Sequence, residues 1–374
     1  MRGEKLTSID LKGFKSIRHL EDFELLDLNV FIGPNGAGKS NFISFFRLLN
    51  WMTPSPGNLQ LHVADIGGAN SILHDGVNTT PQLECVLTFQ TEQGQNKYRM
   101  RLFHAAGDTL IFANEEFLYV PKGGTPPFNW QPLGAGQRES SLVSAAELGN
   151  TTARFILTLI KKCVVYQFHN TSKTSRMRQR WPIDDNRFLK EDAGNIAPVL
   201  HRLREVSPKH YQRIVRNVRL VAPFFGDFVL EPEGADGNSI FLRWREQGTD
   251  CEFSAPQASD GTLRCLALIT LLLQPIDDLP SVLILDEPEL GLHPYAIKLV
   301  AGLVSAVSEH RQVLIATQSE TLINHFEPRN IVVVERKGRE TNFRRLDENK
   351  LMDWLENYTL AELWEKNVLG GRPS

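Results

Sequence analysis

An octapeptide near the amino terminus has the residue types and spacing of a phosphate-binding loop. Residues 33–40 are GPNGAGKS and fit the pattern G-x-x-x-x-G-K-[ST], between a short apolar run and the start of a helical pattern. Glycines let backbone N–H groups curl around phosphate oxygens, and a helix N-terminus adds favourable partial charge. We expect Lys39 to bind the β- and γ-phosphates of ATP and Ser40 to ligate Mg²⁺. The other residues expected to line this loop are Asn35, Gly36, Ala37, Gly38 and Asn41.

Two consecutive carboxylates follow a second apolar run. The segment SVLILDEPELGLHP, residues 281–294, predicts a buried strand with Asp286 and Glu287 at its carboxyl end, where α/β sheets bind ligands. Neighbouring strand residues point to opposite faces, so the two carboxylates can have different tasks. We expect Asp286 to hold Mg²⁺ through a water molecule and Glu287 to polarise the attacking water. The alternative is an acidic helix cap after a strand that Pro288 ends, and the phosphate loop favours the catalytic interpretation.

A third apolar run, QVLIATQSE at residues 312–320, ends in further polar residues. Gln318 is our candidate for a hydrogen bond to the γ-phosphate. Ser319 can instead act as the N-cap of a following helix, and both roles can hold for neighbouring residues.

The segment SDGTLRCLAL, residues 259–268, places small and polar residues before an apolar helix. Ser259 or Asp260 is expected to accept N–H bonds as the N-cap. A helix N-terminus with serine and glycine is also a phosphate receptor. Arg264 either braces an interface or forms an internal salt bridge, and the pattern leaves both alternatives open.

The elements that must position these residues come from both ends of the chain. Alternating apolar residues predict a strand at 6–14, and a short apolar run predicts another at 28–33. Three runs between 81 and 120 predict antiparallel strands. Residues 141–220 are expected to be mostly helical. The last third alternates helices at 261–273 and 294–309 with apolar strands, which is the pattern of a parallel sheet.

Composition indicates a globular protein with a locally basic middle. The 374 residues are 41% apolar and 23% charged, with a formal net charge of -3. Residues 161–220 nevertheless hold 14 lysines and arginines against 5 acidic residues. The four cysteines lack metal-ligand spacing, and neither a secretory signal nor a membrane-spanning apolar run is present in the pattern, so we expect a cytoplasmic protein without a membrane partner.

The densest basic stretch, SKTSRMRQRW at residues 172–181, is the candidate surface for DNA or RNA. Its cations could meet phosphates, and Trp181 could stack on a base. The alternative is a solvated segment whose arginines pair with nearby carboxylates, and it has the greater weight because basic helical faces are common. The candidate phosphate contacts are Lys173, Arg176, Arg178 and Arg180.

The order of these motifs resembles that of RecF-like and SMC-like ATPases of the ABC superfamily, in particular the stand-alone bacterial predicted ATPases with an AAA-type core (AAA_21). The matching segments are LKGFKSI, FIGPNGAGKSN, SDGTLR, LDEPELGLHP and ATQSE. The resemblance implies an α/β fold, namely an ABC-type P-loop NTPase head. This head has a mixed sheet with helices on both faces, an antiparallel β part near the N-terminus and a mostly helical middle lobe.

The resemblance also implies roles for individual residues. Lys15 and Ser16 would approach the nucleotide. Ser259 and Gly261 would occupy the ABC signature and face the γ-phosphate held by a second copy's Lys39. Residues 291–293 would contact that opposite subunit.

Two features depart from the pattern of the family. Gln318 stands where many ABC ATPases have a switch histidine, and glutamine cannot carry a proton. The family's Q-loop glutamine corresponds to Gln60 or Gln82, and the sequence leaves this choice open.

We therefore expect three parts: residues 1–125 and 251–374 forming the ATPase head, and a basic middle lobe at 126–250. The resemblance implies Mg²⁺-dependent ATP hydrolysis by an ATP-sandwiched homodimer or higher homo-oligomer, coupled to nucleic-acid binding in DNA maintenance or anti-phage defence. The alternative is an ATPase scaffold or timer that recruits or restrains a separate effector protein such as a nuclease. A transporter subunit would carry a more LSGGQ-like signature, and a P-loop kinase would not need Glu287.

Overall fold

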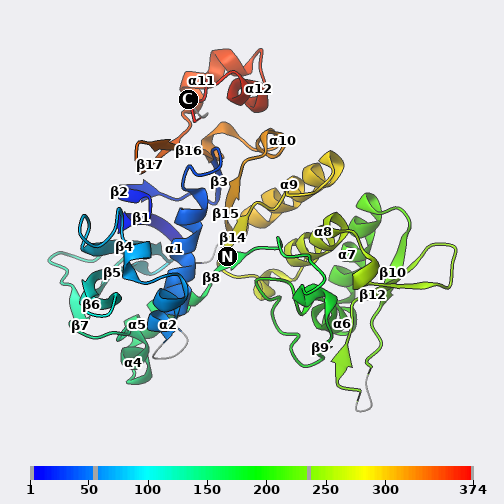
Figure 1. The fold of residues 1–374 in the computed structure, drawn as a ribbon, viewed down its shortest axis with the longest axis horizontal. Helices are drawn as coiled ribbons and strands as arrows, with labels where there is room; N and C mark the ends of the chain where they lie inside the picture. Colours follow the sequence, from blue (N-terminus) through cyan, green and yellow to red (C-terminus); the bar gives the residue numbers. More distant parts are fainter. Residues whose placement is uncertain (1–3, 54–57, 234–236, 372–374) are drawn as a thin grey trace.

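The protein consists of two sheets with a helix between them and a helical lobe beside them (Figure 1). The computed structural model describes residues 4–53, 58–233 and 237–371. Helix α1 (Lys39–Trp51) buries its aromatic face between the two sheets. The first sheet is antiparallel and the second is mostly parallel, so the fold is mixed α/β, as predicted.

The antiparallel sheet comes from the N-terminal part of the chain. Its strands alternate buried and exposed side chains, because one face packs on α1 and its neighbouring helices. Described in spatial order, its strands are β2 (Ile17–Glu24), β1 (Lys5–Phe14), β4 (Gln82–Gln90), β5 (Gly94–Ala105), β6 (Thr109–Pro121) and β7 (Gln131–Gly134). The predicted antiparallel group between 81 and 120 is thereby confirmed.

The second sheet combines strands from both ends of the chain with one from the middle. Three of its strands are buried along their whole length, because helices cover both faces. Described in spatial order, its strands are β17 (Glu340–Arg345), β16 (Ile331–Lys337), β3 (Leu28–Ile32), β15 (Gln312–Thr317), β14 (Val282–Asp286) and β8 (Cys163–Tyr166). All pairings except β16–β17 are parallel, so the functional segments after β3, β14 and β15 meet at one edge.

Helices on the N-terminal side pack with the antiparallel sheet, and helices from the rest of the chain cover the other face of the parallel sheet. The first group contains α2 (Asn58–Asp65), α3 (Ala69–Ile72), α4 (Leu142–Glu147) and α5 (Thr151–Lys161). The second group contains α8 (Asp260–Leu272), α9 (Pro294–Ser308), α10 (Glu320–Ile323), α11 (Glu348–Leu355) and α12 (Leu360–Glu365). Helices α8 and α9 confirm the helices predicted at 261–273 and 294–309.

The lobe at the side of the parallel sheet is built around α6 (Ile196–Val206) and α7 (Pro208–Val221). Small antiparallel pairings complete it. They are β10 (Phe225–Val229) with β12 (Arg243–Glu246), β12 with β13 (Glu252–Ser254), and β9 (Trp181–Pro182) with β11 (Ser239–Ile240).

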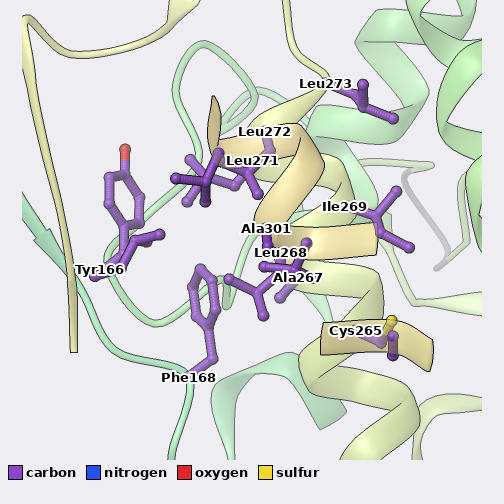
Figure 2. Close-up of a cluster of buried hydrophobic side chains, with 14 of the residues drawn as sticks. Tyr166, Phe168, Cys265, Ala267, Leu268, Ile269, Leu271, Leu272, Leu273 and Ala301 are labelled. Atoms are coloured by element: carbon purple, nitrogen blue, oxygen red, sulfur yellow. The ribbon is translucent and has the colours of Figure 1, made fainter. Parts of the chain in front are cut away.

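The lobe and the parallel sheet share one hydrophobic core. Figure 2 shows Tyr166 at the end of β8 and Phe168 just after it, close to the buried leucines of α8. The prediction that residues 141–220 are mostly helical therefore needs correction between 163 and 195, where the structure has β8, a short 3-10 turn at Arg176–Arg178 and β9 but no α-helix. The apolar residues of β8 interrupt the helices, because a parallel strand beside β14 buries them more completely.

In the described ranges, no helix is long and apolar enough to cross a membrane.

One buried glutamine joins the two sheets. The Gln312 amide accepts a hydrogen bond from the Leu6 N–H at 3.1 Å, and its Nε2 donates to the Leu6 carbonyl at 2.8 Å and the Leu26 carbonyl at 3.0 Å. These bonds connect β15 to β1 and to the chain just before β3.

We predict that Gln312→Ala lowers the free energy of unfolding by about 2–4 kcal/mol, because it leaves buried backbone groups without partners. Urea denaturation followed by circular dichroism measures this change. The control is Gln131→Ala on exposed strand β7, which should change the midpoint little. Equal midpoints for Gln312→Ala and the wild type would contradict the role of this side chain.

Candidate nucleotide site

The loop after β3 has a backbone that requires glycine. Gly36 and Gly38 have φ angles of 78° and 111°, which side chains other than glycine rarely adopt. A Cβ at Gly38 would lie 2.1 Å from Thr341 Oγ1, and one at Gly33 would lie 2.3 Å from the Val334 carbonyl oxygen. The loop is thus pressed against the β16–β17 hairpin, and helix α1 begins directly after it at Lys39.

Lys39 lies inside this loop. Its Nζ donates to the Gly33 carbonyl at 2.6 Å and to the Pro34 carbonyl at 3.1 Å, and the residue is buried. Burial lowers the pKa of Lys39, against the opposing effect of the carboxylates of residues 286, 287 and 289. Ser40 is exposed at the start of α1. An ammonium and a hydroxyl in this arrangement suit a bound polyphosphate.

The two carboxylates after β14 have different environments. Asp286 is buried, its Oδ1 has no hydrogen-bond partner among the described residues, and burial raises its pKa. Glu287 is partly exposed and has a left-handed backbone with φ 44°, and its N–H donates to the Ala316 carbonyl at 2.8 Å. The separation of tasks expected for this pair therefore has a structural basis.

The donor set at this edge fits Mg²⁺. Asp286 offers a buried, unpartnered carboxylate oxygen, and such a group is stabilised by a cation. In the described residues, no cluster of three or more His, Cys, Asp or Glu side chains could hold a metal by itself. That agrees with magnesium chemistry, since Mg²⁺ in nucleotide sites is bound by one or two protein ligands together with phosphates and water.

A glutamine from the middle of the chain reaches the Asp286 carboxylate. Gln167 directly follows β8, and its Nε2 donates to Asp286 Oδ2 at 3.3 Å and lies 3.0 Å from His169 Nδ1. Its Oε1 accepts from Arg47 of α1 at 2.5 Å. His169 Nε2 lies 3.0 Å from the Asp286 carbonyl oxygen. Gln167 therefore connects α1 with the carboxylate edge of the sheet.

Neither glutamine proposed from the sequence has this position. Gln60 Nε2 donates to the Leu110 and Arg138 carbonyls, and Gln82 Nε2 donates to Glu84. Both bond within the antiparallel sheet and its surroundings. The sequence analysis did not single out Gln167, because the strand before it was taken for part of a helical segment.

Glu289 is a second carboxylate that the sequence analysis missed. It is buried, accepts a hydrogen bond from the Thr317 hydroxyl at 2.5 Å, and has an unpartnered Oε2. Burial raises its pKa. Ser319 caps α10 by accepting from the Leu322 N–H at 3.1 Å, as expected, and Gln318 stands exposed between these anchored neighbours.

Lys15 and Ser16 lie against the first turns of α1. The Lys15 ammonium donates to the Ser44 hydroxyl at 2.9 Å. Ser16 Oγ accepts from Asn41 Nδ2 at 2.7 Å and lies 2.7 Å from the Thr341 hydroxyl, which donates to the Ala37 carbonyl at 2.8 Å. The structure thus brings this turn, the phosphate loop and the β16–β17 hairpin together.

The polar start of α8 faces a pocket away from this loop. Ser259 is the N-cap, because its Oγ accepts from the Thr262 N–H at 3.1 Å. A Cβ at Gly261 would lie 2.6 Å from the Gly291 carbonyl oxygen, so the two turns touch. These two turns and the exposed side chain of His293 line a pocket of about 210 Å³. Helix α8 packs on the face of the parallel sheet opposite α1.

Of the two roles that the sequence left open for Arg264, the internal salt bridge is absent from the described residues, and the interface role stays a prediction. The Arg264 guanidinium donates to three backbone carbonyls, those of Phe168 at 3.2 Å, His169 at 3.0 Å and Leu290 at 3.0 Å. The side chain ties α8 to the segments that follow β8 and β14.

The arginines of 172–181 mostly bond within the chain. Arg178 is the clearest correction: its side chain is 8% exposed, donates to the Thr171, Ala255 and Ala258 carbonyls and pairs with Asp260 at 3.0 Å. It cannot reach a phosphate without breaking these bonds.

The neighbouring basic residues are nearer the surface. Arg176 lies over the Trp181 ring at 4.6 Å, and Arg180 pairs with Glu233 at 3.0 Å. Lys173 is exposed. Arg176 also pairs with Asp192 at 3.6 Å, so the carboxylate partners of these arginines come both from nearby and from distant segments.

The fold is that of an ABC-type P-loop ATPase head. The family model described as "AAA domain, putative AbiEii toxin, Type IV TA system" (AAA_21) matches residues 28–120 and 161–324, and the chain belongs to this family. The resemblance to AAA_21 proteins and to the SMC-like ATPase core is thereby confirmed.

Two solved structures have the same fold. One is the Smc head bound to the C-terminal winged-helix domain of ScpA, with a TM-score of 0.60, 15% identity, and coverage of 93% of this chain and 99% of that chain. The other is the Smc head domain with an extended coiled coil bound to the C-terminal domain of ScpA derived from Pyrococcus furiosus, with a TM-score of 0.59, 16% identity, and coverage of 94% and 99%. No curated protein matches this chain.

The buried carboxylate of Asp286 leads to a prediction about pH. Burial raises its pKa, so the folded protein binds a proton more tightly than the unfolded chain does. The ionised group therefore lowers stability at neutral pH, and stability is regained as the pH falls through the raised pKa. Without Mg²⁺ or nucleotide, we expect Asp286→Asn to unfold at a higher temperature than the wild type at pH 7.5.

The difference in unfolding temperature should shrink as the pH is lowered. Differential scanning fluorimetry at pH 7.5 and at progressively lower pH measures this difference. The matched control is Asp184→Asn, which changes the same group at an exposed position and should leave the difference near zero. An Asp286→Asn protein that is less stable than the wild type at pH 7.5 would contradict the assignment of a destabilising buried charge.

Proposed function

We propose that this protein hydrolyses ATP with Mg²⁺ in a dimer whose two nucleotides are each held between two copies of the chain. One observation supports this proposal above the others. Helix α1, which follows the phosphate loop, and helix α8 pack on opposite faces of the parallel sheet, and Ser259 and Gly261 make no hydrogen bond to residues 33–41 in the described structure. A second copy can supply that helix start to the nucleotide.

The phosphate loop of one chain would hold the nucleotide. Backbone N–H groups of residues 35–41 and the Lys39 ammonium would bind the phosphates. Ser40 and Asp286 would hold Mg²⁺, which neutralises phosphate charge and polarises the reacting phosphoryl group when bound. Gln167 would keep the Asp286 carboxylate in place through its bond to Oδ2.

The nucleophile would be water activated by this chain's own carboxylate. Glu287 lies next to Asp286 and is partly exposed, so it can accept a proton from a water molecule at the site. Gln318 is exposed between Thr317 and Ser319, both of which are anchored by hydrogen bonds. It would donate a hydrogen bond to the γ-phosphate without moving a proton.

Closure of such a dimer would couple the nucleotide state to nucleic-acid binding in the cytoplasm, in DNA maintenance or anti-phage defence. The basic balance of residues 161–220 supports this part of the proposal.

A second candidate function is an ATPase scaffold or timer that recruits or restrains a separate effector protein. The internal bonds of Arg176, Arg178 and Arg180 favour it, because they leave Lys173 as the exposed cation without a described ion pair in the proposed nucleic-acid segment. The solved heads similar in fold are described as bound to the protein ScpA.

We predict that Glu287→Gln binds ATP and accumulates as a dimer or larger assembly. Glutamine keeps the size of the side chain but cannot accept the proton, so hydrolysis should fall by about 100-fold or more. Size-exclusion chromatography with light scattering, at saturating ATP and Mg²⁺, measures the assembly. The control is Glu309→Gln, at an exposed position after α9, which should behave as the wild type.

A Glu287→Gln protein that binds ATP and remains monomeric would overturn the shared site. The same trapped protein distinguishes the two candidate functions. Purified with ATP, it should retain nucleic acid in the first case, whereas an associated protein without nucleic acid would support the second.

A further inference from the structure

Helix α7 carries positive charge without any carboxylate. Between Pro208 and Val221 its sequence is PKHYQRIVRNVRLV, which contains one lysine and three arginines and no Asp or Glu. The opposite stripe of the helix is apolar and buried in the lobe core. It consists of Tyr211, Ile214, Val215 and Val218.

The cations of α7 form one exposed stripe. Lys209, Arg213 and Arg216 are exposed and follow one another at spacings of four and three residues, which places them on one face. In the described part of the chain, no carboxylate forms an ion pair with any of the three. Arg219 continues the stripe, but its guanidinium donates to the Gly226 carbonyl.

The carboxylates closest in sequence to this stripe are otherwise engaged. Glu205, just before α7, lies 3.5 Å from the Arg204 guanidinium. Asp227, just after it, accepts from the Tyr211 hydroxyl at 2.6 Å. Neither of these two carboxylates therefore pairs with the cations of the stripe.

We propose that the exposed face of α7 binds the phosphate backbone of a nucleic acid. This inference rests on the nucleic-acid part of the proposed function and moves the contact from residues 172–181 to 209–216. Residues 209 to 216 span about 10 Å of helix axis, which corresponds to about three base pairs of B-DNA. Arginine suits this task because its planar guanidinium can bind a phosphate with two parallel hydrogen bonds.

A membrane surface fits this helix less well. An amphipathic helix binds a bilayer by inserting its apolar face, and the apolar face of α7 is packed in the core around Ile214 and Val218. The exposed face of α7 carries three cations in a row and one exposed large apolar side chain, Leu220, which is too small a surface to insert into a bilayer. The phosphate backbone of a nucleic acid matches that geometry.

The position of α7 would link a bound nucleic acid to the nucleotide site. The C-terminal part of the helix, at Val218 and Val221, lines the same 210 Å³ pocket as Ser259, Gly261 and His293. A nucleic acid on α7 would thus lie on the element that supports the start of α8. Nucleic-acid binding and the contact between two copies of the chain would then involve the same region of the surface.

The test compares two double variants of the full chain that have the same net charge. Arg213→Glu with Arg216→Glu reverses two charges of the stripe. Arg101→Glu with Arg336→Glu reverses two exposed cations on the sheets, neither of which has a described ion pair. Fluorescence anisotropy with a labelled 30-base-pair DNA duplex and a 30-nucleotide single-stranded RNA, between 50 and 200 mM salt, measures binding.

We expect the α7 double variant to bind at least tenfold more weakly at 50 mM salt, with a shallower dependence of affinity on salt. Loss of two phosphate contacts should reduce the slope on duplex DNA by about 1.8. The sheet variant should bind as the wild type does, and the basal ATPase rates of both variants should match it. Equal weakening by both variants would show a diffuse effect of net charge and overturn the assignment to α7.

The two levels of the proposal fail in different ways. If the wild type binds both nucleic acids and the α7 variant binds them equally tightly, the assignment to α7 is wrong and nucleic-acid coupling stands. If the wild type binds neither probe with or without ATP, nucleic-acid coupling fails together with this inference. Retention of an acidic protein by the stripe in that case would support the effector alternative.

Discussion

The architecture depends on keeping a buried carboxylate where a cation can reach it. Asp286 ends a strand that is buried along its whole length, and one of its oxygens has no hydrogen-bond partner. An ionised group in that position lowers the stability of the folded protein unless it is compensated, because burial removes the water that would solvate it. Glu289 adds a second buried carboxylate nearby, with an unpartnered oxygen of its own. The sheet therefore holds these two carboxylates at a cost in stability.

Rigid supports around Asp286 follow from this constraint. Gln167 bonds to the carboxylate and to Arg47, so β8 and α1 are fixed relative to β14. Arg264 bonds to the carbonyls of Phe168, His169 and Leu290, and so fixes the start of α8 to the segments that follow β8 and β14. Few hydrogen bonds therefore separate the carboxylate edge from the exposed start of α8.

Local sequence patterns correctly predicted the phosphate loop and the strands beside it. Glycine spacing placed the phosphate loop, and short apolar runs placed β3, β14 and β15, because a strand covered on both faces is apolar throughout. The Ser259 cap was also predictable, since it depends on neighbours within three residues. The roles of the residues at these positions remain predictions.

Contacts between distant segments were not predictable from local patterns. Strand β8 has four residues and lies between helical segments, so its apolar residues fit a helix equally well by themselves, and Gln167 was missed with it. Arg178 and Arg264 bind backbone carbonyls that converge only after folding. The charge of an arginine shows nothing about such partners, so Arg178 was assigned to a nucleic-acid surface, and Arg264 to an interface or an internal salt bridge.

Mixing two inactive variants tests the shared site most directly. Lys39→Ala removes the phosphate-loop cation, and Ser259→Arg blocks the start of α8. In a symmetric dimer the mixed pair has one intact site, formed by Lys39 of one copy and Ser259 of the other. We expect each variant alone to hydrolyse almost no ATP, and an equal mixture to recover roughly a quarter of the wild-type rate. A mixture as inactive as its components, with both proteins folded and able to exchange subunits, would contradict a site built from two chains.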